Sequence, residues 1–153
     1  MTFRFRPRYR GVAWTSIAVG GSLALVATVV GMVLVPLGAG AIGVVLGSAY
    51  LASSTWKLRV VVDDAGLEVG TPTRQRFRIA WSDIAKVVAS PTTHTCFVDG
   101  GAPSRSLLVP GVGAPAPYDI ENRPALVEFI LAHVASERVQ TVDTLESAMK
   151  ATS

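Results

Sequence analysis

The most informative absence in this sequence is charge. No residue from Gly11 to Trp56 is Asp, Glu, Lys, Arg or His, and a soluble domain of this size has no way to bury so long an uncharged run. A helix that crosses the hydrocarbon core of a bilayer needs about 20 apolar residues, so the run is long enough for two crossings. Pro36 and Gly38 interrupt its helical pattern. The sequence therefore predicts a transmembrane helical hairpin, with helices at residues 12–35 and 37–55.

Cysteine and the common catalytic motifs are also scarce. Cys96 is the only cysteine, which excludes an internal disulfide and a metal site built from several cysteines. The sequence has no Gly-rich loop ending in Gly-Lys-Ser/Thr, no His-Glu-x-x-His pair and no Gly-x-Ser-x-Gly motif. His94 and Cys96 supply only two metal ligands, and His133 stands without a nearby acid. We therefore expect no metal, no cofactor and no catalytic residue, and a protein that is not an enzyme.

Acidic residues are missing from the first ten positions. Arg4, Arg6, Arg8 and Arg10 lie there, although the whole chain has 14 basic and 11 acidic residues. We expect residues 1–10 to form a basic cytoplasmic arm beside anionic lipid headgroups. A nucleic-acid partner is not expected, because a nucleic-acid surface should carry its basic excess on the folded domain.

The charges that flank the hairpin predict its orientation. Lys57 and Arg59 follow the second predicted helix directly, so cations stand at both ends of the hairpin. By the positive-inside rule, both termini are predicted to be cytoplasmic in a multi-pass protein of the inner (plasma) membrane. A cleavable signal peptide is the alternative for the N-terminus, but the apolar run is too long and a second one follows it.

Aromatic and small residues indicate how the hairpin is held. Tyr9 and Trp14 mark the first membrane interface, and Tyr50 and Trp56 mark the end of the second helix. Small residues recur at intervals of four: Ser16, Gly20, Ala24 and Thr28 in the first helix, and Ala39, Gly43 and Gly47 in the second. This spacing permits close helix packing in lipid, and we place Gly20, Gly43 and Gly47 at the contact. The alternative is that glycine and alanine are simply frequent in transmembrane helices.

After Lys57 the hydrophobic period changes from helical to two, which is typical of strands. Strands are expected at residues 58–62, 67–69, 74–81, 84–89, 95–98 and 105–109. A helix should run from Asn122, as its N-cap, to about Ser136, with Pro124 in its first turn. We therefore predict a domain at residues 57–136, with about six or seven antiparallel strands and a C-terminal capping helix, and a short helical or frayed tail at residues 137–153.

Two short motifs accompany this order of elements. They are Asp64-Ala65-Gly66-Leu67, and Trp81-Ser82-Asp83-Ile84 followed by Val87. On these residues the chain resembles bacterial pleckstrin-homology-like (PH-like) domains, and more narrowly membrane proteins of the low-molecular-weight protein antigen type. The resemblance covers roughly residues 56–134 and implies a β-sandwich or barrel of two bent antiparallel sheets, capped by the helix. It implies no single activity, and the acidic turn at Asp63 and Asp64 argues against the phosphoinositide grip of eukaryotic relatives.

One arrangement of charged residues is a candidate binding surface. Arg74, Arg76 and Arg78 stand at two-residue spacing and are expected on one face of a strand. Such a strip could meet anionic lipid or an acidic partner, although a solvated charged face is the commoner explanation. We expect a membrane-anchored interaction or scaffolding module that binds a protein or lipid partner without catalysis. The alternative is a small accessory or regulatory subunit of a larger membrane complex, and association into a homo-oligomer is left open.

Overall fold

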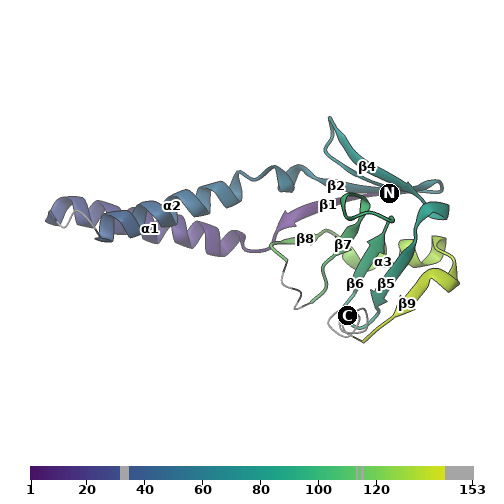
Figure 1. Ribbon diagram of the computed structural model, residues 1–153. Coiled ribbons are helices and arrows are strands. Elements are labelled where there is room, and N and C mark those ends of the chain that lie inside the picture. The colour runs from purple at the N-terminus through teal and green to yellow at the C-terminus, as the bar shows by residue number, and fades with distance from the viewer. Residues whose placement is uncertain (32–34, 113, 115, 144–153) are drawn as a thin grey trace. The chain divides into compact units, whose positions relative to one another are not determined.

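The chain folds into two compact units, whose elements are labelled in Figure 1. In this computed structural model, residues 1–31, 35–112, 114 and 116–143 are described. The hairpin unit is Pro7–Ser54, and the β unit combines Met1–Arg6 with Thr55–Ser153. The chain therefore starts in the β unit, leaves it for the hairpin unit and then returns.

Two apolar helices form the hairpin unit: α1 (Arg10–Val30) and α2 (Val35–Leu51). By length and composition, α1 and the segment Val35–Lys57 are each able to cross a membrane. This segment includes α2 and the short 3-10 helix η1 (Ser54–Lys57). The uncharged run is thus divided into two helices, as predicted from its length.

The first helix ends earlier than expected. Gly31 follows α1 in a left-handed conformation, with φ of 76°, and its N–H bonds the carbonyl oxygen of Ala27. This conformation favours glycine and is a common way to stop a helix. The predicted break at Pro36 and Gly38 is wrong, because both residues lie inside α2. Pro36 stands in the first turn, where its missing N–H breaks no helical hydrogen bond.

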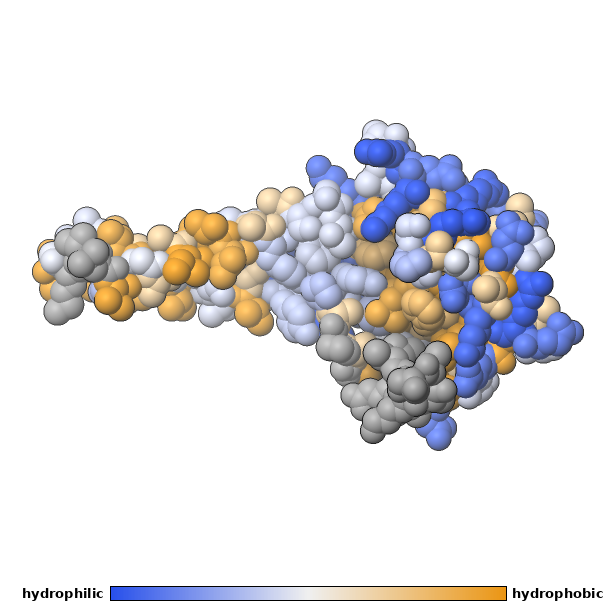
Figure 2. Space-filling view, in the orientation of Figure 1, coloured by the Kyte–Doolittle hydropathy of each residue, from blue (hydrophilic) through white to orange (hydrophobic). Residues whose placement is uncertain are grey.

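Glycine lets the two helices approach each other closely. A β-carbon on Gly20 would lie 2.6 Å from the carbonyl oxygen of Gly40, and one on Gly47 would lie 2.8 Å from that of Ala13. Gly43 lies at the same contact, where a β-carbon would be 3.2 Å from the carbonyl oxygen of Ser16. The large apolar side chains are exposed instead, and Figure 2 shows such hydrophobic surface along the helices. They include Val19, Leu25, Val26, Ile42, Val45 and Leu46.

The predicted interfacial aromatic residues occupy the ends of the helices. The Tyr50 hydroxyl accepts a hydrogen bond of 3.0 Å from the backbone N–H of Tyr9, so the two open ends of the hairpin unit are joined. Trp14 is exposed on the first turns of α1. Trp56 lies in η1 and belongs to the β unit.

Nine strands form two sheets in the part of the chain that the structure describes. The first sheet has the order β4-β3-β2-β1-β8. The second has the order β7-β6-β5-β9, which can be followed in Figure 1. The bounds in the first sheet are β1 (Thr2–Pro7), β2 (Arg59–Asp63), β3 (Gly66–Gly70), β4 (Gln75–Ala80) and β8 (Tyr118–Ile120). Those in the second are β5 (Lys86–Ser90), β6 (Thr95–Asp99), β7 (Leu107–Val109) and β9 (Val139–Thr141).

The N-terminal residues are part of the first sheet. The expectation of a separate basic arm at residues 1–10 is wrong for Thr2–Pro7, which form β1 and pair antiparallel with β2. Phe3 and Phe5 are 5% and 6% exposed, whereas Arg4 and Arg6 are exposed. This alternation puts the aromatic rings in the core and the arginines outside, so the β unit starts before the predicted boundary at residue 57.

One helix packs against the core between the two sheets. It is α3 (Arg123–His133), which buries Leu126, Val127 and Ile130. It ends three residues before the predicted end at Ser136. Asn122 is the N-cap residue, as predicted, but its backbone is left-handed and its side chain makes no capping hydrogen bond.

The strand count exceeds the six or seven expected because three short or unpredicted strands join the sheets. β1 and β8 extend the first sheet, and β9 extends the second. β9 runs parallel to β5, since α3 carries the chain across to the other end of the sheet, as a parallel pairing requires. The predicted tail at residues 137–153 thus starts in the 3-10 helix η4 (Ser136–Arg138) and continues as the strand β9, and residues 144–153 lie outside the described part.

Candidate functional site

A β-bulge sets the directions of the arginine side chains in the predicted strip Arg74, Arg76 and Arg78. Val69 pairs with Phe77, but Gly70 pairs with Gln75, so Arg76 has no residue opposite it. An extra residue of this kind bends its strand and redirects its side chain. Arg74 lies before β4, where its backbone N–H and carbonyl both bond Thr71. The predicted strip on one sheet face therefore does not form.

Arg78 is neutralised by its neighbours. Its guanidinium lies 2.9 Å from a carboxylate oxygen of Asp63 and 3.8 Å from one of Glu68. Glu68 is also its direct cross-strand partner, and opposite charges in such positions stabilise a sheet. This arginine therefore supports the sheet and is less available to an anionic ligand than Arg76.

Asp63 also organises the turn between β2 and β3. One of its carboxylate oxygens accepts hydrogen bonds of 2.9 Å from the backbone N–H groups of Ala65 and Gly66. Desolvation raises the pKa of Asp63, but these N–H groups and the Arg78 guanidinium together hold it below its ordinary value. The indole N–H of Trp81 donates to the Asp63 carbonyl oxygen at 2.9 Å. The Asp63 carboxylate thus stabilises the turn between β2 and β3.

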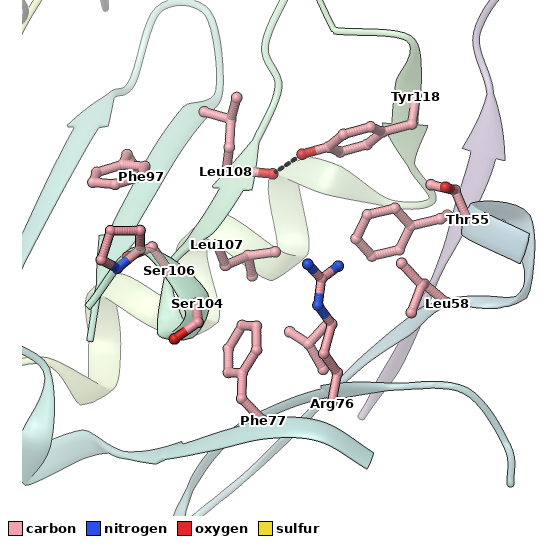
Figure 3. Close-up of a pocket in the computed structure, with 13 residues that line it drawn as sticks. Thr55, Leu58, Arg76, Phe77, Phe97, Ser104, Ser106, Leu107, Leu108 and Tyr118 are labelled. Carbon is pink, nitrogen blue, oxygen red and sulfur yellow. Dashed lines mark hydrogen bonds between the residues drawn. The ribbon is translucent and has the colours of Figure 1, made fainter. Parts of the chain in front are cut away.

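Arg76 lies at an open cleft between one edge of each sheet, which Figure 3 shows in close-up. The cleft has a volume of about 320 Å³, at the lower end of the range for small-ligand sites. Most of the residues that line it are apolar: Phe5, Leu58, Val69, Phe77, Phe97, Pro103, Leu107 and Leu108. The polar lining comes from Arg76 and from the hydroxyl groups of Thr55, Ser104, Ser106 and Tyr118.

The cleft holds one cation among apolar side chains. Figure 3 shows the Arg76 side chain extending from β4 into the cleft, toward the side lined by Leu107 and Tyr118. Among the described residues, no carboxylate lies within ion-pair distance of its guanidinium. A guanidinium beside an apolar surface attracts a ligand that has both an anionic and an apolar part.

Tyr118 fixes the opposite wall. Its hydroxyl donates a hydrogen bond of 2.9 Å to the carbonyl oxygen of Leu108 (Figure 3), and its ring lies 4.9 Å from that of Phe5. Burial raises the pKa of Tyr118, and the positive charge of Arg76 acts in the opposite direction. The phenol therefore stays neutral near pH 7 and holds β8 to β7.

The cleft runs beside two edge strands. β4 ends the first sheet and β7 ends the second, and an edge strand carries backbone groups that can pair with another chain. Phe97 and Leu108 are directly paired across β6 and β7, and both line the cleft. An extended peptide segment could therefore be held there by side chains and backbone together.

The histidines and the cysteine do not converge on one place. Cys96 is 0% exposed in the core, and burial raises the pKa of its thiol to about 12. His94 is exposed in the turn before β6, and the ring of His133 stacks on Phe129 at 4.2 Å. In the described residues, no group of three or more His, Cys, Asp or Glu side chains could hold a metal ion.

Comparisons of the chain with protein-family models, with curated proteins and with solved structures find no match. No function is therefore carried over from a relative. The functional conclusion depends on the hairpin unit, the cleft and the charges of the β unit.

Proposed function

We propose that this chain is a membrane-anchored interaction module of the bacterial inner membrane, which binds its partner in the cleft beside Arg76 and catalyses no reaction. The two apolar helices support the anchoring. Most of their large hydrophobic side chains are exposed, and the contact between the helices is made by small residues together with Ile17. Such a surface suits contact with lipid chains.

The strand order supports a single orientation for both ends of the hairpin unit. β1 precedes α1 and β2 follows α2, yet the two strands are neighbours in one sheet. The chain must therefore return to the side from which it left. Arg8, Arg10, Lys57 and Arg59 flank the apolar helices, and cations in this position favour the cytoplasmic side.

The observation that carries the proposed function is the lone cation in the apolar cleft. Arg76 stands on a bulge, and bulges are frequent next to functional sites. The ligand that suits this lining is an extended segment of a protein partner with apolar side chains and one acidic group. Anchoring the module in the membrane raises its effective concentration toward other membrane proteins, so that weak contacts suffice.

We further propose that the β unit is a PH-like domain. Two sheets of mostly antiparallel strands and a C-terminal helix support this assignment. In this interpretation β1 and β9 are additions to the ends of the sequence region that carries the resemblance. The accessory-subunit alternative is less favoured, because the small residues Gly43 and Gly47 already contact α1.

A site-specific photo-crosslinking experiment tests the function. The residue p-benzoylphenylalanine replaces Phe97 in the cleft of the full-length protein, or replaces the exposed Glu128 on α3 as a control. We expect a protein adduct in membranes from position 97 and not from position 128. Arg76→Gln should reduce this adduct, whereas Arg74→Gln should leave it unchanged.

Two results would contradict this function. The same adducts from both positions would show that the cleft has no selectivity. A lipid adduct from position 97, insensitive to Arg76→Gln, would remove the protein partner.

A further inference from the structure

A second group of cations lies on the outer face of the first sheet. Arg4 of β1 and Arg59 of β2 are direct cross-strand partners. The adjacent pair, Phe3 and Val60, faces the core, with exposed fractions of 5% and 0%. Since side chains alternate between the faces of a sheet, Arg4 and Arg59 both point away from the core.

These arginines line one hollow together with residues that follow α2 in the chain. The hollow has a volume of about 640 Å³, and its lining includes Lys57, Trp56 and the turn residues Thr71 and Thr73. The segment from Trp56 to Arg59 therefore contributes an indole and two cations, and β1 contributes the third cation. We call Arg4, Lys57 and Arg59 the basic triad.

The described part of the chain supplies no counter-charge to the basic triad. Like charges in directly opposed strand positions destabilise a sheet, and none of the four ion pairs between described residues includes Arg4, Lys57 or Arg59. The same sheet treats another cation differently, because Arg78 faces Glu68 and is bound by Asp63. The fold thus leaves the repulsion among the three cations of the triad unbalanced, although it balances the charge of Arg78 in the same sheet. This indicates that an anion from outside the chain binds the triad.

We propose that the basic triad binds the phosphate of an anionic phospholipid headgroup. Guanidinium groups bind phosphate oxygens in a bidentate manner, and two of them with one ammonium match a single phosphate. The choice of lipid over a free anion rests on the membrane anchoring proposed above. Lys57 and Trp56 follow α2 within six residues, and tryptophan and cations concentrate where transmembrane helices meet headgroups.

This headgroup site is separate from the cleft beside Arg76. Among the described residues, Leu58 alone lines both. The two sites therefore bind different ligands: the basic triad binds a lipid headgroup, and the cleft remains open for the protein partner. Arg74, Arg76 and Arg78 are not needed for lipid binding in this account.

The experiment measures lipid binding by the full-length protein in a neutral detergent. The probes are short-chain phosphatidylglycerol, short-chain phosphatidylcholine and inorganic phosphate, and the variants are the double change Arg4→Gln/Arg59→Gln and its control Arg74→Gln/Lys86→Gln. The control removes the same charge from exposed positions outside the triad. We expect phosphatidylglycerol affinity to fall at least about tenfold in the first variant only, as loss of two charge-assisted contacts implies.

The unfolding temperature supplies a second, independent outcome. Arg4→Gln/Arg59→Gln removes the cross-strand repulsion, so the variant should unfold at the same or a higher temperature than the parent while it binds lipid more weakly. A lower unfolding temperature would make weak binding a folding defect; Arg4→Lys/Arg59→Lys then decides, because it must keep most of the affinity if the charges act directly.

Three results would overturn the proposal. They are unchanged phosphatidylglycerol affinity in Arg4→Gln/Arg59→Gln, equal affinity for phosphatidylcholine, and binding of inorganic phosphate as tight as that of the lipid. Membrane fractionation in the same preparations separates this proposal from the proposed function. A protein that stays in the membrane fraction and still crosslinks from position 97 would lose only the headgroup site.

Discussion

In the hairpin unit, Gly20 and Gly40 let two backbones touch, whereas in the β unit Leu67, Ile79 and Ile84 fill the space between the sheets. The same chain therefore reaches close packing in two ways. Between the helices it removes side chains, since apolar surface gains nothing from leaving lipid. Between the sheets it uses large branched side chains, because their burial removes apolar area from water.

Because the two units pack differently, a change in side-chain size should have opposite effects in them. Shortening an apolar side chain should destabilise the core of the β unit but not the exposed surface of the helices. Enlarging a side chain should destabilise the contact between the helices.

Truncating the β-unit core should have the largest effect. Ile84 is 0% exposed, and Ile84→Ala should cost about 2–5 kcal/mol of unfolding free energy by loss of burial and by the cavity left behind. The measurement is the rate at which a thiol reagent modifies Cys96 in the intact protein. This thiol is fully buried with a pKa of about 12, and only an exposed thiolate reacts.

The labelling rate of Ile84→Ala should rise at least about tenfold, because each 1.4 kcal/mol changes the open population tenfold. The control is Ile42→Ala, at a position that is 61% exposed on α2. Fast labelling of the parent protein under native conditions would contradict the buried position of Cys96.

Adding a side chain between the helices should have the next largest effect. In Gly20→Val the β-carbon would lie only 2.6 Å from the carbonyl oxygen of Gly40. Overpacking of this kind costs about 1–3 kcal/mol. The matched control is Gly21→Val, because a β-carbon on Gly21 meets nothing within 4 Å. Spin labels at the exposed positions Val19 and Ile42 should report a longer or broader distance in Gly20→Val alone. Equal distances in both variants would remove the close helix contact.

Changing the acidic turn should have a small effect that depends on pH. The pKa of Asp63 is lowered below 3.8 in the folded protein, so its contribution to stability is fully present above that pH and is lost as the pH falls through the folded pKa. Asp63→Asn should therefore lower the unfolding temperature slightly at pH 7, and the difference from the parent should shrink in acid. The measurement is thermal unfolding from pH 7 to pH 3; a constant difference across this range would contradict the role of the ionised carboxylate.

Local patterns were enough to predict the elements that depend on neighbours along the chain. The uncharged run predicts two apolar helices, the alternation at Leu58–Val69 predicts the β2–β3 pair, and Pro124 marks the first turn of α3. In each case the signal and the structure it specifies lie within about 20 residues. These features, and the turn at Asp63, could therefore be predicted.

The features that could not be predicted depend on pairing between distant residues. Phe3 and Phe5 look like an interfacial arm until the chain returns as β2, and only then do they enter the core. Arg76 looks like the middle of a charged strip, because a bulge is a property of two strands and not of one. The basic triad joins Arg4 to Lys57 and Arg59 across the whole hairpin unit, so no local motif could have revealed it.

We propose that the uncharged hairpin crosses the membrane twice and leaves the β unit in the cytoplasm. Two phosphatase fusions test it most directly in living cells: one inserted after Gly31, between the two helices, and one after Ser153. The enzyme is active only outside the cytoplasm. The account predicts strong activity from the fusion at Gly31 and none from the fusion at Ser153. Inactivity at both positions, or activity at Ser153, would contradict it.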